Sequence, residues 1–148
     1  MQENASHTPE MVERFLDSTL ESVDSAEELA VGMAQRAGMD EDDLMKVGMA
    51  IRESVVNAVV HGNRYNSQKK VRFAVALDGQ SFTVRVGDEG EGFDTSALPD
   101  PLAEENLLRQ SGRGVLMMQT FMDEFQVRPR HPSGTEVRMV KFRNKDGN

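Results

Sequence analysis

A carboxylate and a carboxamide lie four residues apart in the middle of the sequence, at Glu53 and Asn57. Because residues with this spacing project from one face of an α-helix, both side chains would point the same way. An amide oxygen is a hard, neutral ligand for magnesium, and a carboxylate can accept a proton from an attacking hydroxyl group. The pair fits a magnesium–nucleotide site, and it equally fits a solvated helix face with a hydrogen bond between the two side chains.

A second polar group, Asp88-Glu-Gly-Glu-Gly92-Phe93-Asp94, follows an alternating apolar segment that ends at Val86. An aspartate at the end of a strand can accept a hydrogen bond from the amine of a base, and nearby glycines let the backbone pass close to the ring. A glycine-rich surface turn is one alternative. A calcium loop is another because four residues here carry carboxylates, but the loop spacing with its terminal glutamate is missing.

A third group, Ser111-Gly112-Arg113-Gly114, precedes an apolar segment that begins Val115-Leu-Met-Met. Glycines at the start of a helix leave backbone N–H groups directed along the positive end of the helix dipole, which favours an anion. Arg113 and Arg109 would add positive charge. Glycines before a helix are also ordinary, so this group has no special meaning by itself.

The second of two predicted helices must carry the first group. Ser25-Ala-Glu-Glu28 has the form of a capping box, and apolar residues follow at helical spacing until Gly38, which is suited to end a helix. Asp40 can cap a second, longer helix that the sequence His61-Gly62-Asn63 ends.

The second group must follow a strand, and the third must open a further helix. Apolar and polar residues alternate over 71–77 and again over 82–86, and Asp78-Gly79 between them is typical of a type I′ turn, so we predict a β-hairpin. We further predict an edge strand within 11–19, a third helix over 115–122 and two strands around His131-Pro132-Ser133-Gly134. This order favours an α+β two-layer sandwich, with helices on one face of a mostly antiparallel sheet.

Composition limits the classes that the chain can belong to. A length of 148 residues suits one domain, which we place at 11–143 between polar tails at 1–10 and 144–148. The chain has no cysteine, which excludes disulfides, thiolate metal sites and thiol nucleophiles. No apolar run is long enough to span a membrane, and the first residues are too polar for a signal peptide, so we expect a cytoplasmic protein.

The net charge of −8 is distributed unevenly. Residues 1–43 contain twelve acids and two arginines, a balance of −10, whereas the rest of the chain is +2. An acidic total argues against a nucleic acid partner, but the slightly basic remainder is compatible with a bound polyphosphate. The acidic segment predicts contacts with a basic protein surface.

In their sequence order, the three polar groups resemble the N, G1 and G2 boxes of the GHKL superfamily of ATPases and kinases. Gly134-Thr135 is similar to the Gly-Thr that closes the adenine pocket in that family. Within the superfamily, the chain looks most like the RsbW and SpoIIAB type of anti-sigma factor serine/threonine kinases. The residues that match the three boxes are Glu53, Asn57-Ala58 and His61-Gly62; Asp88, Gly90 and Gly92-Phe93; and Gly112-Arg113-Gly114.

The resemblance implies the Bergerat ATP-binding fold and a site for ATP and Mg²⁺. Asn57 would be the metal ligand, Glu53 the general base, and Asp88 the group that reads the adenine amine. Residues 95–111 would form an ATP lid. The residues implied to contact the nucleotide are Asn57, Asp88, Gly90, Gly92, Phe93, Ser111, Gly112, Arg113, Gly114 and Thr135.

The same resemblance implies a function in a partner-switching pathway that regulates transcription. The protein would sequester a sigma factor or another regulated protein and would phosphorylate a STAS-domain anti-sigma factor antagonist. Homodimers are also implied, with no direct contact to nucleic acid or membrane. The alternative is a nucleotide-gated protein-binding module without phosphotransfer activity.

Overall fold

The computed structural model describes residues 9–91 and 113–143. Five strands and three α-helices follow one another along these segments, and a π-helical turn, η1, continues the second helix. The elements in chain order are β1 (Glu10–Asp17), α2 (Glu21–Arg36), α3 (Glu41–Val56), η1 (Asn57–Gly62), β2 (Lys70–Leu77), β3 (Ser81–Gly87), α5 (Arg113–Phe121), β4 (Glu124–Pro129) and β5 (Thr135–Phe142).

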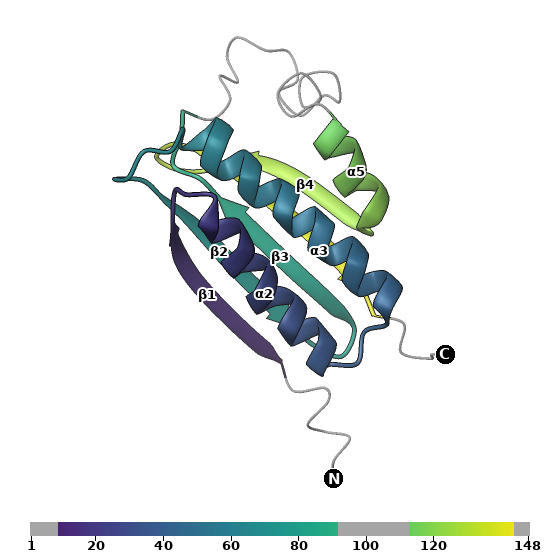
Figure 1. The fold of residues 1–148 in the computed structure, drawn as a ribbon. Helices are drawn as coiled ribbons and strands as arrows, with labels where there is room; N and C mark the ends of the chain where they lie inside the picture. Colours follow the sequence, from purple (N-terminus) through teal and green to yellow (C-terminus); the bar gives the residue numbers. More distant parts are fainter. Residues whose placement is uncertain (1–8, 92–112, 144–148) are drawn as a thin grey trace.

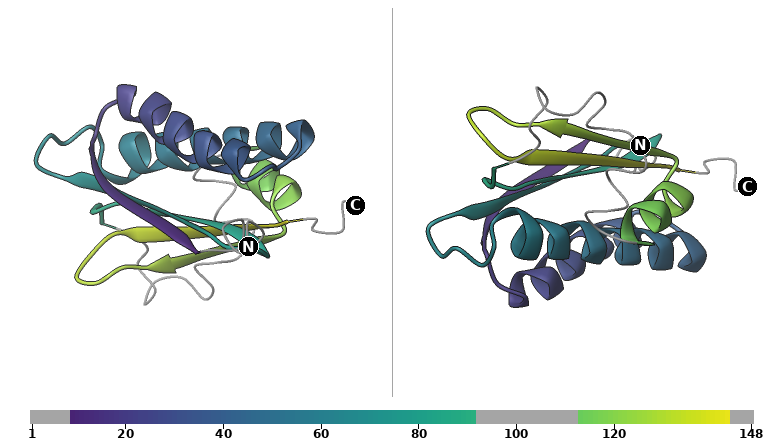
Figure 2. Two further views of the ribbon diagram at one scale, coloured as in Figure 1. Left: turned by 90° about the horizontal axis from the view of Figure 1, so that it is seen from below. Right: turned by 90° about the horizontal axis from the view of Figure 1, so that it is seen from above.

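The strands form one sheet in the order β1-β2-β3-β5-β4, and every neighbouring pair is antiparallel. All three helices cover the same face of this sheet (Figures 1 and 2). The predicted α+β two-layer sandwich is therefore confirmed. The strand predicted within 11–19 is β1, and it lies at an edge of the sheet, as predicted.

The core lies between the two layers. Val75, Val84 and Met139 form one row across β2, β3 and β5, and all three are fully buried. Phe73 and Phe82 are buried beside them, and each contributes roughly 2–3 kcal/mol through removal of its ring from water. The helices contribute buried side chains to the same core, among them Met33 of α2 and Ile51 of α3.

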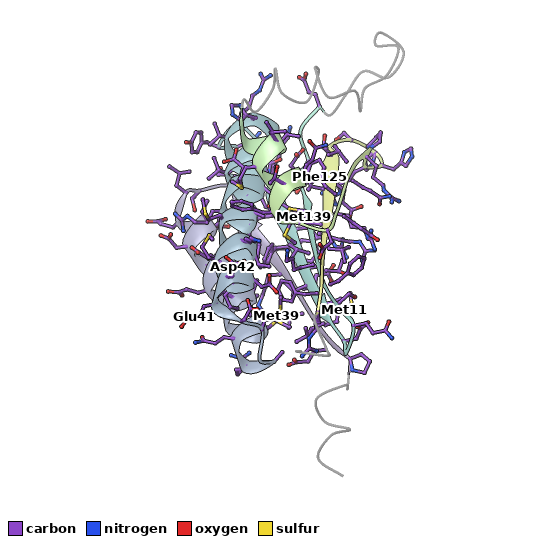
Figure 3. The ribbon with its side chains drawn as sticks, turned by 90° about the vertical axis from the view of Figure 1, so that its right-hand side faces the viewer. Met11, Met39, Glu41, Asp42, Phe125 and Met139 are labelled. Atoms are coloured by element: carbon purple, nitrogen blue, oxygen red, sulfur yellow. The ribbon has the colours of Figure 1, made fainter. Side chains whose placement is uncertain are left out.

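The link between α2 and α3 follows the sequence prediction. Gly38 has a φ of +89°, which suits the residue that ends a helix. The Asp40 side chain accepts a hydrogen bond of 2.8 Å from the backbone N–H of Asp43 and so caps α3. Glu41 and Asp42 lie on the outer side of the helical layer (Figure 3).

Two local predictions were wrong. Helix α2 begins at Glu21 rather than at Ser25, because the chain turns directly after β1 and the Ser22 hydroxyl donates to the Asp17 carbonyl at 2.7 Å. The hairpin forms, but its turn is not type I′. Among the described residues, positive φ angles occur elsewhere, and here the Asp78 carboxylate accepts from the N–H groups of Gln80 and Ser81.

Within the described segments, none of the helices combines the length and apolar character needed to cross a bilayer.

Candidate functional site

Four segments that are distant in the sequence meet at one end of the sandwich. This is the end of the sheet where β3 stops, where α3 passes into η1 and where α5 begins (Figure 1). Glu53 lies in the last turns of α3, and Asn57 is the first residue of η1. Asp88 and Gly90 follow β3, Gly114 lies in the first turn of α5, and Thr135 starts β5.

Glu53 and Asn57 share one helix face, as their spacing predicted. The backbone N–H of Asn57 still donates to the Glu53 carbonyl, so the α-helical geometry holds between them, and both side chains are half-buried. The helix then widens: the N–H of Asn63 donates to the Ala58 carbonyl at 2.8 Å, five residues back. Such π turns are frequent at functional sites, and nothing in the sequence pattern indicated this one.

Glu53 lies directly against the start of α5. A methyl group added at Gly114 would overlap the Glu53 carboxylate, so the contact depends on a glycine at this position. The carboxylate thus lies beside the first turn of a helix, where backbone N–H groups favour an anion. The structure joins the first and third groups of the sequence at this contact.

Asp88 is buried, with 8% of its surface exposed. Its Oδ1 accepts hydrogen bonds from the backbone N–H groups of Gly90, at 2.9 Å, and Thr135, at 3.3 Å. In the described part of the chain, no group donates to its Oδ2. Burial raises the pKa of the Asp88 carboxyl group above its ordinary value, and the two hydrogen bonds and the nearby Arg130 partly offset this rise.

Backbone packs closely around Asp88. A methyl group at Gly90 would overlap the Gly62 carbonyl, and one at Gly62 would overlap the Asp88 carboxylate. Gly134, whose φ is +106°, lies against the Asp88 carbonyl in the same way. The end of η1, the residues after β3 and the turn before β5 therefore form one close-packed cradle.

The chain matches the model of the histidine kinase-like ATPase domain over residues 16–141. It belongs to this family. The serine-protein kinase RsbW of Staphylococcus epidermidis is 28% identical to it, over 94% of this chain and 91% of the relative. The anti-sigma F factor of Bacillus subtilis is 31% identical over 70% of this chain and 73% of the relative.

A solved structure has the same fold. The RsbU and RsbW domains of Rv1364c from Mycobacterium tuberculosis match with a TM-score of 0.64 at 20% identity, over 90% of this chain and 32% of that longer one. The predicted membership of the GHKL superfamily and the predicted similarity to the RsbW type are confirmed. The predicted assignment as a protein serine/threonine kinase agrees with the names of the relatives.

Several predicted residues of this ATPase domain lie outside the described part of the chain. Helix α5 begins at Arg113, two residues before the predicted start at Val115, and the Arg113 side chain is not among those described. The residues and segments outside the description are Gly92, Phe93, Ser111, Gly112, the predicted lid over 95–111, and the tails at 1–8 and 144–148.

Two residues near the site were not predicted to belong to it. Arg130 donates to the Asp88 carbonyl at 2.9 Å. Asn63, which the sequence used only as the end of a helix, is 2% exposed and accepts a hydrogen bond from the N–H of Glu89 at 2.7 Å. Both contacts join residues far apart in sequence, and one sequence carries no signal for such pairs. The Glu89 carboxylate accepts from the Lys70 N–H, which weighs against the calcium-loop interpretation.

Proposed function

We propose that the protein is a cytoplasmic, ATP-dependent serine/threonine kinase of the anti-sigma factor type. It would phosphorylate a STAS-domain anti-sigma factor antagonist and sequester a sigma factor or another regulated protein. The observation that carries this proposal is the juxtaposition of Glu53 with the first turn of α5, at the same end of the sheet as the buried Asp88. The names of the relatives supply the reaction class.

The residues at this end of the sheet fit a nucleotide. Oδ2 of Asp88 has no donor among the described residues and can accept a hydrogen bond from the amino group of adenine. Gly90 and Gly114 let the Gly62 carbonyl and the Glu53 carboxylate lie against the backbone, at positions that a larger side chain would occupy. The N–H groups at the start of α5 suit phosphate oxygens.

A magnesium ion also fits, with Asn57 as its protein ligand through the amide oxygen. Within the described ranges, His, Asp and Glu side chains form no group of three that could hold a metal by themselves. Such an ion would therefore take its other ligands from phosphate oxygens and water, as magnesium commonly does at nucleotide sites.

In the proposed mechanism the chain positions ATP and the hydroxyl group of the substrate, and it accepts one proton from that hydroxyl group. ATP with Mg²⁺ supplies the phosphoryl group and the neutralising charge. Asp88 orients the base, and the first turn of α5 holds the phosphates, with Arg113, Gly112 and Ser111 as predicted contributors. Glu53, beside that turn, would accept the proton of the serine or threonine hydroxyl as the new oxygen–phosphorus bond forms. The bond between the γ-phosphorus and the oxygen that bridges it to the β-phosphorus breaks in the same step, and ADP leaves. Thr135, Gly92 and Phe93 would complete the adenine pocket.

We also propose that two copies associate through the β1 edge of the sheet. Met11 and Phe15 of β1 are each 64% exposed, and their spacing of four residues places them on the same face of the strand. An edge strand with exposed apolar residues is a common site of association. The family resemblance, which implies homodimers, agrees with this arrangement.

The test of the reaction is transfer of label from γ-labelled ATP to the STAS-domain proteins of the same cell. Replacing the proposed base, Glu53→Gln, should lower the transfer rate by about 10²–10⁴-fold, the usual contribution of a general base. ATP affinity, measured in parallel, should change little. The matched control is Glu41→Gln, the same change at the exposed start of the same helix, which should leave the transfer rate intact.

Undiminished transfer by Glu53→Gln would show that another group accepts the proton. A wild-type protein that binds ATP but labels none of the STAS-domain proteins would instead favour a nucleotide-gated binding module.

A further inference from the structure

Asn63 lies at the centre of a buried hydrogen-bond network next to the proposed adenine subsite. Its Nδ2 donates to the Ser18 hydroxyl at 2.9 Å and to the Lys70 carbonyl at 3.1 Å. Its Oδ1 accepts from the N–H of Glu89 at 2.7 Å. The Ser18 hydroxyl, itself buried, donates a hydrogen bond to the Lys69 carbonyl at 2.5 Å. Both donors and the acceptor of the Asn63 amide are therefore used.

This network fixes the residues that follow β3 from one side. The bond to the Glu89 N–H sets the orientation of the peptide that joins Asp88 to Glu89. The Glu89 carboxylate accepts from the backbone N–H of Lys70 at 2.6 Å and fixes the same segment a second time. Gly90 then lies where its N–H reaches Oδ1 of Asp88 at 2.9 Å.

The orientation of the Asp88 carboxylate depends on that last bond. With Oδ1 engaged by Gly90 and Thr135, the free lone pairs lie on Oδ2, beside Gly62. A rotation of the peptide after Asp88 would move the Gly90 N–H and release the carboxylate from this orientation. Because a hydrogen bond weakens steeply once its angle falls below about 120°, a rotation of that size would weaken recognition of the base.

From this geometry we propose that Asn63 is a positioning residue that sets the selectivity of the site for adenine. The inference rests on the proposed function, in which Asp88 reads the amino group of the base. Asn63 does not contact the nucleotide in this account. It acts through the backbone of Glu89, while Ser18 and Lys70 hold its amide in place.

A purely structural role for Asn63 makes a different prediction. If the amide only ended η1 and stabilised the fold, its loss would weaken the binding of every nucleotide to the same degree. A positioning role instead changes the preference between nucleotides that differ only in the group that Asp88 reads.

The experiment measures the affinity of each variant for ATP and for purine riboside triphosphate, which lacks the amino group of adenine. The wild-type protein should prefer ATP by about tenfold or more, the usual value of a hydrogen bond to a charged group. Asn63→Ala should remove most of this preference, and Ser18→Ala, which frees one donor of the Asn63 amide, should reduce it less. The rate of transfer at saturating ATP should change little in both variants.

The matched control is Asn66→Ala, which removes an exposed asparagine three residues further along the chain. Among the described residues, its side chain accepts a hydrogen bond from the Gln68 N–H alone, so the preference for ATP should persist. Circular dichroism at the assay temperature verifies that each variant is folded, and Ser18→Ala decides the matter if Asn63→Ala does not fold.

The inference alone is overturned if the wild-type protein prefers ATP and the folded variants keep that preference. A wild-type protein that binds neither nucleotide overturns the proposed function, and this inference with it.

Discussion

Single residues at the site are held in place largely by backbone groups. Asp88 receives N–H groups from Gly90 and Thr135, and its own carbonyl accepts from Arg130. Such contacts require that the side chain itself stay short and that its neighbours lack side chains. This explains why glycine occupies positions 62 and 134, which abut Asp88, and position 90, which abuts the Gly62 backbone.

Burial of the Asp88 carboxylate lowers the stability of the folded protein by an amount that depends on pH. Because burial raises its pKa in the folded protein, the unfolded chain releases its proton first as the pH increases above the ordinary value of 3.8. The folded state therefore loses stability as the pH rises from there through the raised pKa, and the loss stays constant above it.

Replacing the carboxylate with its neutral isostere should remove this cost. We expect Asp88→Asn to melt about 2–4 °C above the wild-type protein near neutral pH, a difference of ~1 kcal/mol. The difference should shrink as the pH falls toward the ordinary carboxyl value. Thermal unfolding of both proteins across this range measures it. A gap that widened toward acidic pH would show that the native state favours the charged form.

The sequence could predict the types of residue at the site but not all of their contacts. The meeting of Glu53, Asp88, Gly90, Gly114 and Thr135 at one end of the sheet follows from boxes whose residue types and order are distinctive. Asn63 and Arg130 were not predicted, because asparagine after a helix and arginine near a turn are common residues. Their roles depend on neighbours that only the fold supplies.

At the scale of elements, the contact between α3 and α5 carries the proposed chemistry. A methyl group at Gly114 would displace the Glu53 carboxylate, which can rotate away because it is the end of a flexible side chain. Gly114→Ala should therefore lower phosphoryl transfer by about 10²-fold while the protein stays folded, since the base leaves its position.

The matched control for this variant is Gly32→Ala. Gly32 lies within α2, and an added methyl group would meet only the end of the Arg36 side chain, at 3.3 Å. Alanine in a helix is more stable than glycine by roughly 0.5–1 kcal/mol, so this variant should be slightly stabilised with unchanged transfer. Full transfer activity in Gly114→Ala would show that Glu53 does not act from its observed position.

The hydrophobic periods predicted which helices and strands exist, but they predicted less well where each element begins and ends. The alternation in β2 and β3 and the helical spacing in α3 reflect burial against one core, which a sequence records directly. The start of α2 and the turn at Asp78 depend on hydrogen bonds from Ser22 and to Asp78. The π turn η1 arises where α3 meets the residues after β3. The hydrophobic periodicity of the sequence does not predict this turn.

At the scale of the whole molecule, the net negative charge lies in the acidic segment 1–43, whereas the residues of the proposed nucleotide site come from the slightly basic remainder of the chain. Part of the acidic charge is compensated internally, since Arg52 of α3 pairs with Asp24 at 2.8 Å and with Glu27 at 2.7 Å, joining α2 to α3. Asp42 pairs with Lys46 at 3.0 Å. The exposed acids that remain on the helical layer still predict a partner with a basic surface. Added salt should then lower the rate at which this partner associates.

The central claim is that residues from four segments form one nucleotide site. Calorimetric titration of ATP with Mg²⁺ tests this most directly, using the wild-type protein, Asp88→Asn and Glu53→Gln. We predict one nucleotide bound per chain, affinity reduced about tenfold or more in Asp88→Asn, and affinity largely retained in Glu53→Gln. No binding by the wild-type protein, or equal binding by Asp88→Asn, would contradict the claim.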